Sequence, residues 1–324
     1  MNSAEKLDRM LEIRKCISAD FKLYGSMEID FMALSYAISD KLYEKEKLMA
    51  LKDYIKSNTR MFSIYRSNIV QTAMMLELNS DYPTETFDKM LSNHDIFKKN
   101  KYGSNNYLVL ANFALAIDSD IKDPEMIIKR GKEVYNLMRK YHPFLTSGDD
   151  YPLAIMIAKL NENITEKVEE IERYYRELNS RGLAKSNGLQ FLSHILSLIP
   201  GEYDEKINKC IAIYESLKNK KIKVYSDYYC VLGLLSFINY DVEKIVSEMV
   251  EIVAILRNSK HYKWVGKQMM AVLAASLIVD NRSGDEIQTF VGVSFEVILE
   301  QIRQAIMVAV IAGSAAAASA SASS

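Results

Sequence analysis

The side chains with the clearest chemical potential lie in the segment HPFLTSGDD, residues 142–150. The segment holds an imidazole, a hydroxyl and two adjacent carboxylates, on His142, Ser147, Asp149 and Asp150. Such groups can bind a cation or assist hydrolysis. A simpler interpretation is that Ser147 and Gly148 form a turn and Asp149 caps the following helix. We favour the turn and keep a polar site as the alternative.

A second polar feature is His194, which follows Gln190 by one turn of an expected apolar helix. A buried imidazole needs a hydrogen-bond partner, so we predict an internal network between these two side chains. A catalytic base or metal ligand would need an Asp, Glu or Cys at helix spacing, and none stands there. The usual dinucleotide, P-loop, zinc-protease, calcium and nucleophile-elbow motifs are absent. The sequence therefore predicts no catalytic residue, no metal site and no cofactor, and favours a non-catalytic protein over an enzyme.

Composition predicts an all-helical protein. Gly (12) and Pro (5) are scarce in 324 residues, where average usage would give roughly 39. This scarcity argues against turn-rich β-sandwiches and barrels. Lys and Arg (41) nearly balance Asp and Glu (42), for a net charge of −1. Bulk electrostatic attraction to nucleic acid or an anionic membrane is therefore excluded, and no specific nucleic-acid signal is present.

Internal repetition predicts the arrangement of the helices. Pairs of helix-capping residues recur every 40 residues or so, a spacing typical of helical-repeat proteins. They are Ser67-Asn68, Ser104-Asn105, Asp149-Asp150, Ser186-Asn187 and Ser226-Asp227. Each pair precedes a short helix that is apolar nearly all round, and a longer helix with one apolar stripe follows. We predict antiparallel helix pairs, with the apolar helices inside and the striped helices outside, stacked as a solenoid-like α-α repeat array.

The expected domain organisation follows from this repeat. Residues 1–66 are predicted to form an N-terminal helical cap, and 67–281 an array of about five and a half units. A turn at 280–286 would lead to a closing helix at 282–312. The Ala/Ser-rich tail, 313–324, is expected to be disordered. The uncharged stretch 304–318 offers a weaker alternative, a surface anchor for a membrane.

Charge is distributed by loop type. Turns from an inner to an outer helix are acidic, and returns from an outer to an inner helix are basic. The predicted basic edge includes Lys98, Lys99, Arg181, Lys185, Lys218, Lys220 and Lys221. Charges that complement helix dipoles explain this pattern. Binding of an acidic partner along the basic edge is the second explanation, and both can hold together.

Extended segments give a resemblance to a known family. LTSGDDYPLAIMIAKL (145–160) and NGLQFLSHILSL (187–198), with MFSIYRSN (61–68) and NYLVLANFALA (106–116), resemble an uncharacterised all-helical family of bacterial proteins, a domain of unknown function. The likeness runs from about residue 5 to 312. It implies a cytosolic bacterial protein with a helical fold. It carries no activity, substrate or site residue.

These observations favour a protein-binding or scaffolding module, because helical arrays present extended surfaces to a protein or peptide. The alternative is an enzyme or small-ligand sensor with its site near residues 142–150 and the Gln190/His194 face. The charged N-terminal segment does not fit an export signal. The three cysteines are too few for a disulfide framework and are expected to be core residues. We therefore expect a cytoplasmic protein.

Overall fold

The computed structural model describes residues 3–39, 41–160, 162–238, 241–262 and 265–291. These residues form helices joined by loops and contain no strand, which confirms the all-α class. None of the helices described there is both long and apolar enough to cross a membrane. The predicted tail, the 304–318 segment and most of the predicted closing helix lie outside the described residues.

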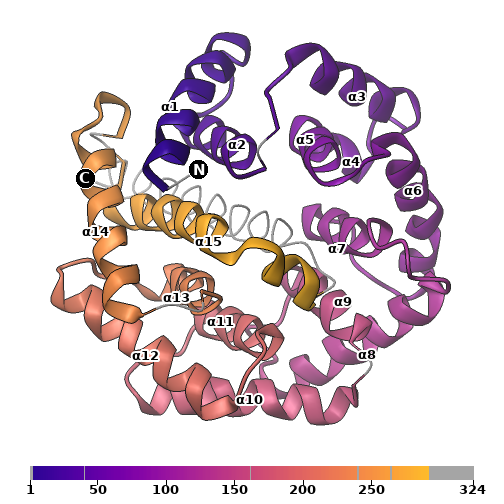
Figure 1. The fold of residues 1–324 in the computed structure, drawn as a ribbon. Coiled ribbons are helices and arrows are strands. Elements are labelled where there is room, and N and C mark those ends of the chain that lie inside the picture. Colours follow the sequence, from indigo (N-terminus) through magenta and orange to yellow (C-terminus); the bar gives the residue numbers. More distant parts are fainter. Residues whose placement is uncertain (1–2, 40, 161, 239–240, 263–264, 292–324) are drawn as a thin grey trace, which may run out of the picture.

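Figure 1 shows the helices arranged in a ring in which outer and inner helices alternate along the chain. The outer helices are α1 (Ser3–Asp20), α3 (Lys45–Ser57), α6 (Pro83–Lys99), α8 (Pro124–Tyr141), α10 (Ile164–Ser180), α12 (Tyr203–Asn219) and α14 (Val242–Asn258). The inner helices are α2 (Ser26–Ile38), α5 (Ile69–Asn79), α7 (Asn106–Ala116), α9 (Tyr151–Lys159), α11 (Asn187–Leu198), α13 (Cys230–Ser236) and α15 (Lys267–Val291). The short α4 (Ile64–Ser67) and three 3₁₀ turns, η1 (Gly148–Asp150), η2 (Ser226–Tyr228) and η3 (Lys260–Tyr262), lie in the connections.

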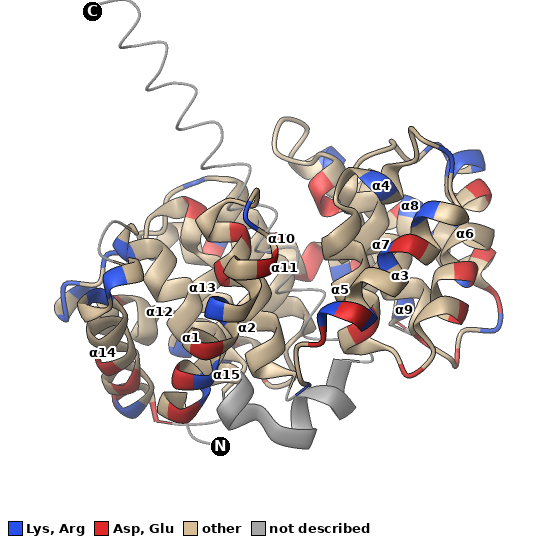
Figure 2. Ribbon diagram, turned by 90° about the horizontal axis from the view of Figure 1, so that it is seen from above, with Lys and Arg blue, Asp and Glu red and all other residues tan. Residues whose placement is uncertain are grey.

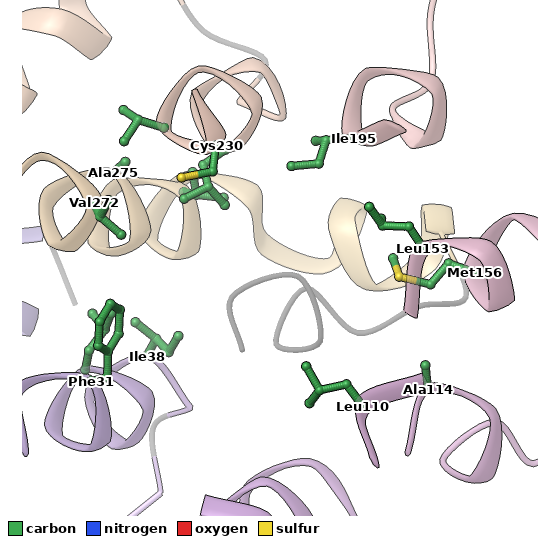
Figure 3. Close-up of a cluster of buried hydrophobic side chains, with 14 of the residues drawn as sticks. Phe31, Ile38, Leu110, Ala114, Leu153, Met156, Ile195, Cys230, Val272 and Ala275 are labelled. Atoms are coloured by element: carbon green, nitrogen blue, oxygen red, sulfur yellow. The ribbon is translucent and has the colours of Figure 1, made fainter. Parts of the chain in front are cut away.

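The two kinds of helix bury their side chains differently, as their sequences predict. All of Leu108–Ala116 in α7 is buried, whereas α8 buries one face that includes Ile127, Val134 and Met138. Figure 3 shows apolar side chains of α2, α7, α9, α11, α13 and α15, all from the inner layer. Close packing needs small residues: a Cβ on Gly233 would lie only 3.0 Å from Cδ1 of Ile195. The inner helices therefore form the core that the outer helices cover.

Side-chain caps are found at two of the five predicted pairs. Asn105 accepts the Leu108 amide at 2.9 Å, Ser186 accepts the Leu189 amide at 3.1 Å, and Asp123 caps α8 before Pro124. The other predicted caps are wrong. Ser67 ends α4, Asn68 makes no side-chain cap, and Ser226 lies within η2. In these connections an extra helical turn takes the place that a cap would occupy.

Three further sequence expectations differ from the structure. The turn predicted at 280–286 is helical, because α15 continues to Val291; one Gly is a weak helix breaker, costing about 1 kcal/mol. Asp149 does not cap α9, because η1 intervenes. Cys16 is exposed, whereas Cys210 and Cys230 are buried. Cys16 lies on the side of α1 that faces away from the core, so the prediction that it is a core residue is wrong.

A buried polar cluster joins the two ends of the described chain. Helices α1 and α2 contact α15, and α1 also contacts α14. Arg14 Nε lies 2.5 Å from Asp30 Oδ1, and the Tyr262 hydroxyl donates to the same oxygen at 3.1 Å. All three side chains are buried. Burial raises the pKa of Asp30, although Arg14 opposes this shift. The Arg14–Asp30 ion pair joins α1 to α2, and the Tyr262–Asp30 hydrogen bond ties this first helix pair to the α14–α15 connection and so helps to close the ring.

Removing the charge of Asp30 should therefore destabilise the whole ring. Asp30→Asn leaves the buried Arg14 guanidinium without a counter-charge, which should lower the free energy of unfolding by about 3 kcal/mol. Urea unfolding followed by circular dichroism measures this change. Glu125→Gln is the control, because it breaks the exposed Lys129–Glu125 pair, and exposed pairs stabilise little. Equal stability of the two variants would refute the closing role of Asp30.

Candidate functional site

The loop between α8 and α9 and the first turns of α11 bring most of the predicted polar residues together. The Ser147 amide donates to Asp150 Oδ2 at 2.9 Å, and the Ser147 hydroxyl donates to Asp149 Oδ1 at 2.5 Å. Asn187 donates to the other Asp149 oxygen at 2.9 Å. The two carboxylates therefore hold the turn in shape and join it to α11.

Asp150 and His194 form the most deeply buried titratable pair of this region. Asp150 Oδ1 lies 3.7 Å from His194 Nδ1, too far for a hydrogen bond. His194 is 1% exposed. Burial raises the pKa of Asp150 well above its ordinary value, and the neighbouring Asp149 charge adds to this. Burial lowers the pKa of His194 to about 3, with His142 contributing. Near pH 7 His194 is therefore neutral.

Gln190 does not pair with His194 as predicted. Its amide nitrogen donates to Thr146 Oγ1 at 2.9 Å, while its oxygen, Oε1, has no hydrogen-bond partner. His194 Nδ1 also has none. Two buried, unsatisfied polar atoms close to Asp150 are costly, since each such atom loses its hydration without a replacement. A bound water or small molecule would satisfy them.

His142 lies at the edge of this cluster and makes different contacts. Its Nε2 is 2.7 Å from Glu172 Oε2, and its ring packs on Tyr175 with centroids 4.3 Å apart. Glu172 also accepts from Arg176 at 3.0 Å. Within the described residues, no group of three or more His, Cys, Asp and Glu side chains converges as a metal site.

The sequence interpretation missed the partners of these residues. They are Thr146 for Gln190, Glu172 for His142 and Asn187 for Asp149. The paired residues are separated by 44, 30 and 38 positions respectively. In each pair one residue lies in the α8–α9 connection and the other in α10 or α11, the next helices along the ring. Searching the next two long helices for polar residues could have found the partners.

The predicted basic edge lies along one rim of the ring. Because outer and inner helices alternate in direction, all loops from an outer to an inner helix lie on the same rim. We call this the basic rim and define it by residues 21–25, 58–68, 100–105, 142–150, 181–186, 220–229, 259–262 and 265–266, with the last turns of the outer helices. Lys98, Lys99, Arg181, Lys185, Lys218, Lys220 and Lys221 all lie there and are exposed. Figure 2 shows basic segments at α4 and along the upper loops.

Few acidic residues oppose these cations. In the described loops and last helical turns of the basic rim they are Asp20, Asp149, Asp150, Glu177 and Asp227, and Asp150 is buried. Two of the predicted cations have neighbours: Arg181 pairs with Glu177 at 2.8 Å and Lys218 lies 3.4 Å from Glu215. Lys185 and Lys220 extend from exposed positions in the loops after α10 and α12. The rim therefore presents an excess of positive charge.

Large exposed apolar side chains also lie on the basic rim, which the sequence interpretation did not anticipate. Leu23 is 100% exposed, Phe62 96% and Phe144 97%. Each belongs to a different loop from an outer to an inner helix. Phe144 projects from the same 142–150 loop whose Thr146 and Asp150 side chains are buried.

Comparison with known proteins places this fold in a family. The profile described as "Protein of unknown function (DUF4003)" matches residues 15–316. The chain belongs to this family. A relative from Bacillus subtilis (strain 168), "Uncharacterized protein YeaA", is 25% identical over 320 residues, which cover 96% of each chain. No solved structure matches the chain. Family membership confirms the resemblance of the sequence to a domain of unknown function and transfers no activity.

The raised pKa of Asp150 predicts a pH-dependent stability. Because the folded state holds this proton more tightly than the unfolded state, the contribution of Asp150 is present below pH 3.8 and is lost as the pH rises through the folded pKa. Asp150→Asn has no carboxyl group that titrates at this position, so its stability does not fall in this way as the pH rises. Above about pH 4, until the pH passes the folded pKa of Asp150, the stability of the variant relative to the original protein should therefore rise, at up to about 1.4 kcal/mol for each pH unit.

Urea midpoints across this pH range measure the effect. Asp227→Asn is the matched control, since Asp227 is an exposed carboxylate on the same rim. If the curves for Asp150→Asn and the original protein run parallel at all pH values, Asp150 is not held in an unfavourable buried site.

Proposed function

We propose that this chain is a binding or scaffolding module whose docking face is the basic rim. One observation carries the proposal: exposed cations and the most exposed large apolar side chains gather on the same rim. Isolated exposed apolar residues are common on proteins. Their gathering on one face beside an excess of one charge is typical of an interaction surface.

The finer features of the fold agree with this role. We propose that the helix pairs are α-α repeats, each built of one inner and one outer helix, with residues 1–66 as the N-terminal cap. Loops of a repeat protein can vary without disturbing the core, so they are suited to carry binding residues. Charges at the helix ends also complement the helix dipoles, so one set of residues serves stability and binding together.

We further propose that the protein acts in the cytoplasm of a bacterium. Its three cysteines are free thiols, as expected in a reducing compartment. The relative from Bacillus subtilis supports a bacterial source.

A second candidate function is a small-ligand sensor or enzyme centred on Asp150, Gln190 and His194. The unsatisfied atoms Gln190 Oε1 and His194 Nδ1 favour it, because a hydrogen-bonding ligand would complete both. Near-complete burial of Gln190 and His194 opposes it, since a substrate would have to open the loop at 142–150. We therefore rank this function second.

Reversing charge on the basic rim tests the docking face. Lys185→Glu with Lys220→Glu should reduce salt-sensitive capture of an anionic partner by more than tenfold, since each reversal replaces attraction with repulsion. The immobilised full chain is incubated with the anionic partner at several salt concentrations, and the amount of partner captured measures the loss of binding. The melting temperature should stay unchanged because both lysines are exposed.

The matched control is Lys89→Glu with Lys122→Glu. These lysines are also exposed, but Lys89 lies within α6 and Lys122 in the α7–α8 loop on the opposite rim. The control should bind as the original protein does. Equal binding by both double variants would remove the basic rim as the docking face.

Substituting His194 separates the two candidate functions. His194→Ala should lower the free energy of unfolding by about 2 kcal/mol, because it leaves a cavity in the core. It should leave capture by the basic rim unchanged. Melting curves recorded with a panel of small metabolites provide the opposing test. A metabolite that raises the melting temperature of the original protein, but not of His194→Ala or of Asp149→Ala with Asp150→Ala, would favour the sensor.

A further inference from the structure

The exposed apolar residues of the basic rim follow cations closely in the chain. Leu23 comes directly after Lys22, and Phe62 comes two residues after Arg60. Phe144 follows Arg139 and Lys140 at the end of α8. A smaller example is Tyr225, which is 55% exposed and comes two residues after Lys223. Each of these loops therefore offers an apolar side chain and a positive charge together.

These loops stand at different places around the ring. The connections α1–α2, α3–α4, α8–α9 and α12–α13 lie in separate sectors of Figure 1. All of them are on the basic rim, so their tips face the same way. A protein interface usually gathers its apolar residues in one central cluster that excludes water. Separate apolar tips, each beside a cation and all on one rim, match a broad, flat surface better than a single pocket.

The opposite rim, which we call the acidic rim, carries mainly negative charge. Its loops contain Glu44, Asp81, Asp118, Asp120, Asp123, Glu162, Glu202 and Asp241, against the cations Lys41 and Lys122. It also has exposed apolar side chains, Leu42 at 75% and Tyr82 at 67%. Tyr82, however, follows the acidic Asp81. An anionic surface would be attracted by the basic rim and repelled by this one, so the charge distribution fixes the orientation of docking.

We propose that the basic rim docks on an anionic lipid bilayer. Leu23, Phe62 and Phe144 enter the boundary between headgroups and acyl chains, while the rim cations contact the lipid phosphates. The near-zero net charge of the chain does not oppose this, because the acidic rim points away from the membrane and surface potentials fall off within a Debye length. The inference rests on the proposed function, in which the basic rim is the docking face, and it names the partner. An acidic protein is the other partner that could bind to the basic rim.

Co-sedimentation of the full chain with lipid vesicles tests this proposal. The vesicles are phosphatidylcholine alone, or phosphatidylcholine with about 30% phosphatidylglycerol. We expect binding to the anionic vesicles only, and its loss when salt is raised from about 50 mM to about 500 mM. Lys185→Glu with Lys220→Glu should weaken binding by at least about fivefold per charge.

The apolar tips are tested with a matched pair of double variants. Phe62→Ser with Phe144→Ser should weaken binding to the anionic vesicles by about tenfold or more, since two side chains no longer enter the bilayer. Leu42→Ser with Tyr82→Ser makes a similar change on the acidic rim and should bind as the original protein does. Melting temperatures of all variants confirm that folding is unaffected.

The outcomes separate this inference from the proposed function. Absence of binding to anionic vesicles at low salt, or equal loss in both serine variants, overturns membrane docking. If the rim lysines are nevertheless required to capture an acidic protein, the docking face stands and its partner is that protein. If the lysine variants bind vesicles and proteins as the original does, the docking face itself is wrong.

Discussion

The inner helices must be buried on every side, and the remaining architecture follows from this requirement. A helix such as α7, apolar all round, is stable only when neighbours cover it completely. Each inner helix is therefore flanked by other inner helices and covered by outer ones, and the outer helices need only one apolar stripe. Connections between the two layers are short, so successive helices run antiparallel. This alternation places all loops of one kind on one rim, which is how charges scattered along the chain become two opposed surfaces.

Two of the buried polar clusters among the described residues are satisfied to different degrees. Where the ring closes, the Asp30 carboxylate accepts hydrogen bonds from both Arg14 and Tyr262, and this geometry offsets the cost of burying the two charged groups. Beside α9, Asp150 and His194 are separated by 3.7 Å, and Gln190 Oε1 and His194 Nδ1 have no hydrogen-bond partner. A protein interior tolerates such a group at a cost in stability. The Asp30 cluster therefore has a structural role, whereas a water or ligand bound beside Asp150 would satisfy polar atoms that have no partner.

The 142–150 loop shows how one segment serves both the core and the surface. Its Thr146 and Asp150 side chains are buried; Asp150 accepts a hydrogen bond from the Ser147 amide, and Thr146 accepts one from Gln190 of α11. Its Phe144 points outward and is almost fully exposed. An apolar residue in water and a carboxylate in the core reverse the usual preference. The reversal gives the loop an exposed apolar residue on the outside and a titratable residue on the inside.

The all-helical class, the alternation of buried and striped helices, and the two classes of loop charge could all be predicted from the amino-acid sequence. These features are local: they depend on periodicity, Gly and Pro content and helix caps such as Asn105 and Ser186, which act within one or two turns. Closure of the ring through Tyr262 and Asp30 emerged only from the packing of the helices, as did the proximity of Asp150 to His194 and the exposure of Phe62 and Phe144. Each depends on which helices become neighbours or on which way a loop turns. Residues such as Glu172 and Thr146 are ordinary in sequence and acquire their roles because folding brings them into contact with His142 and Gln190.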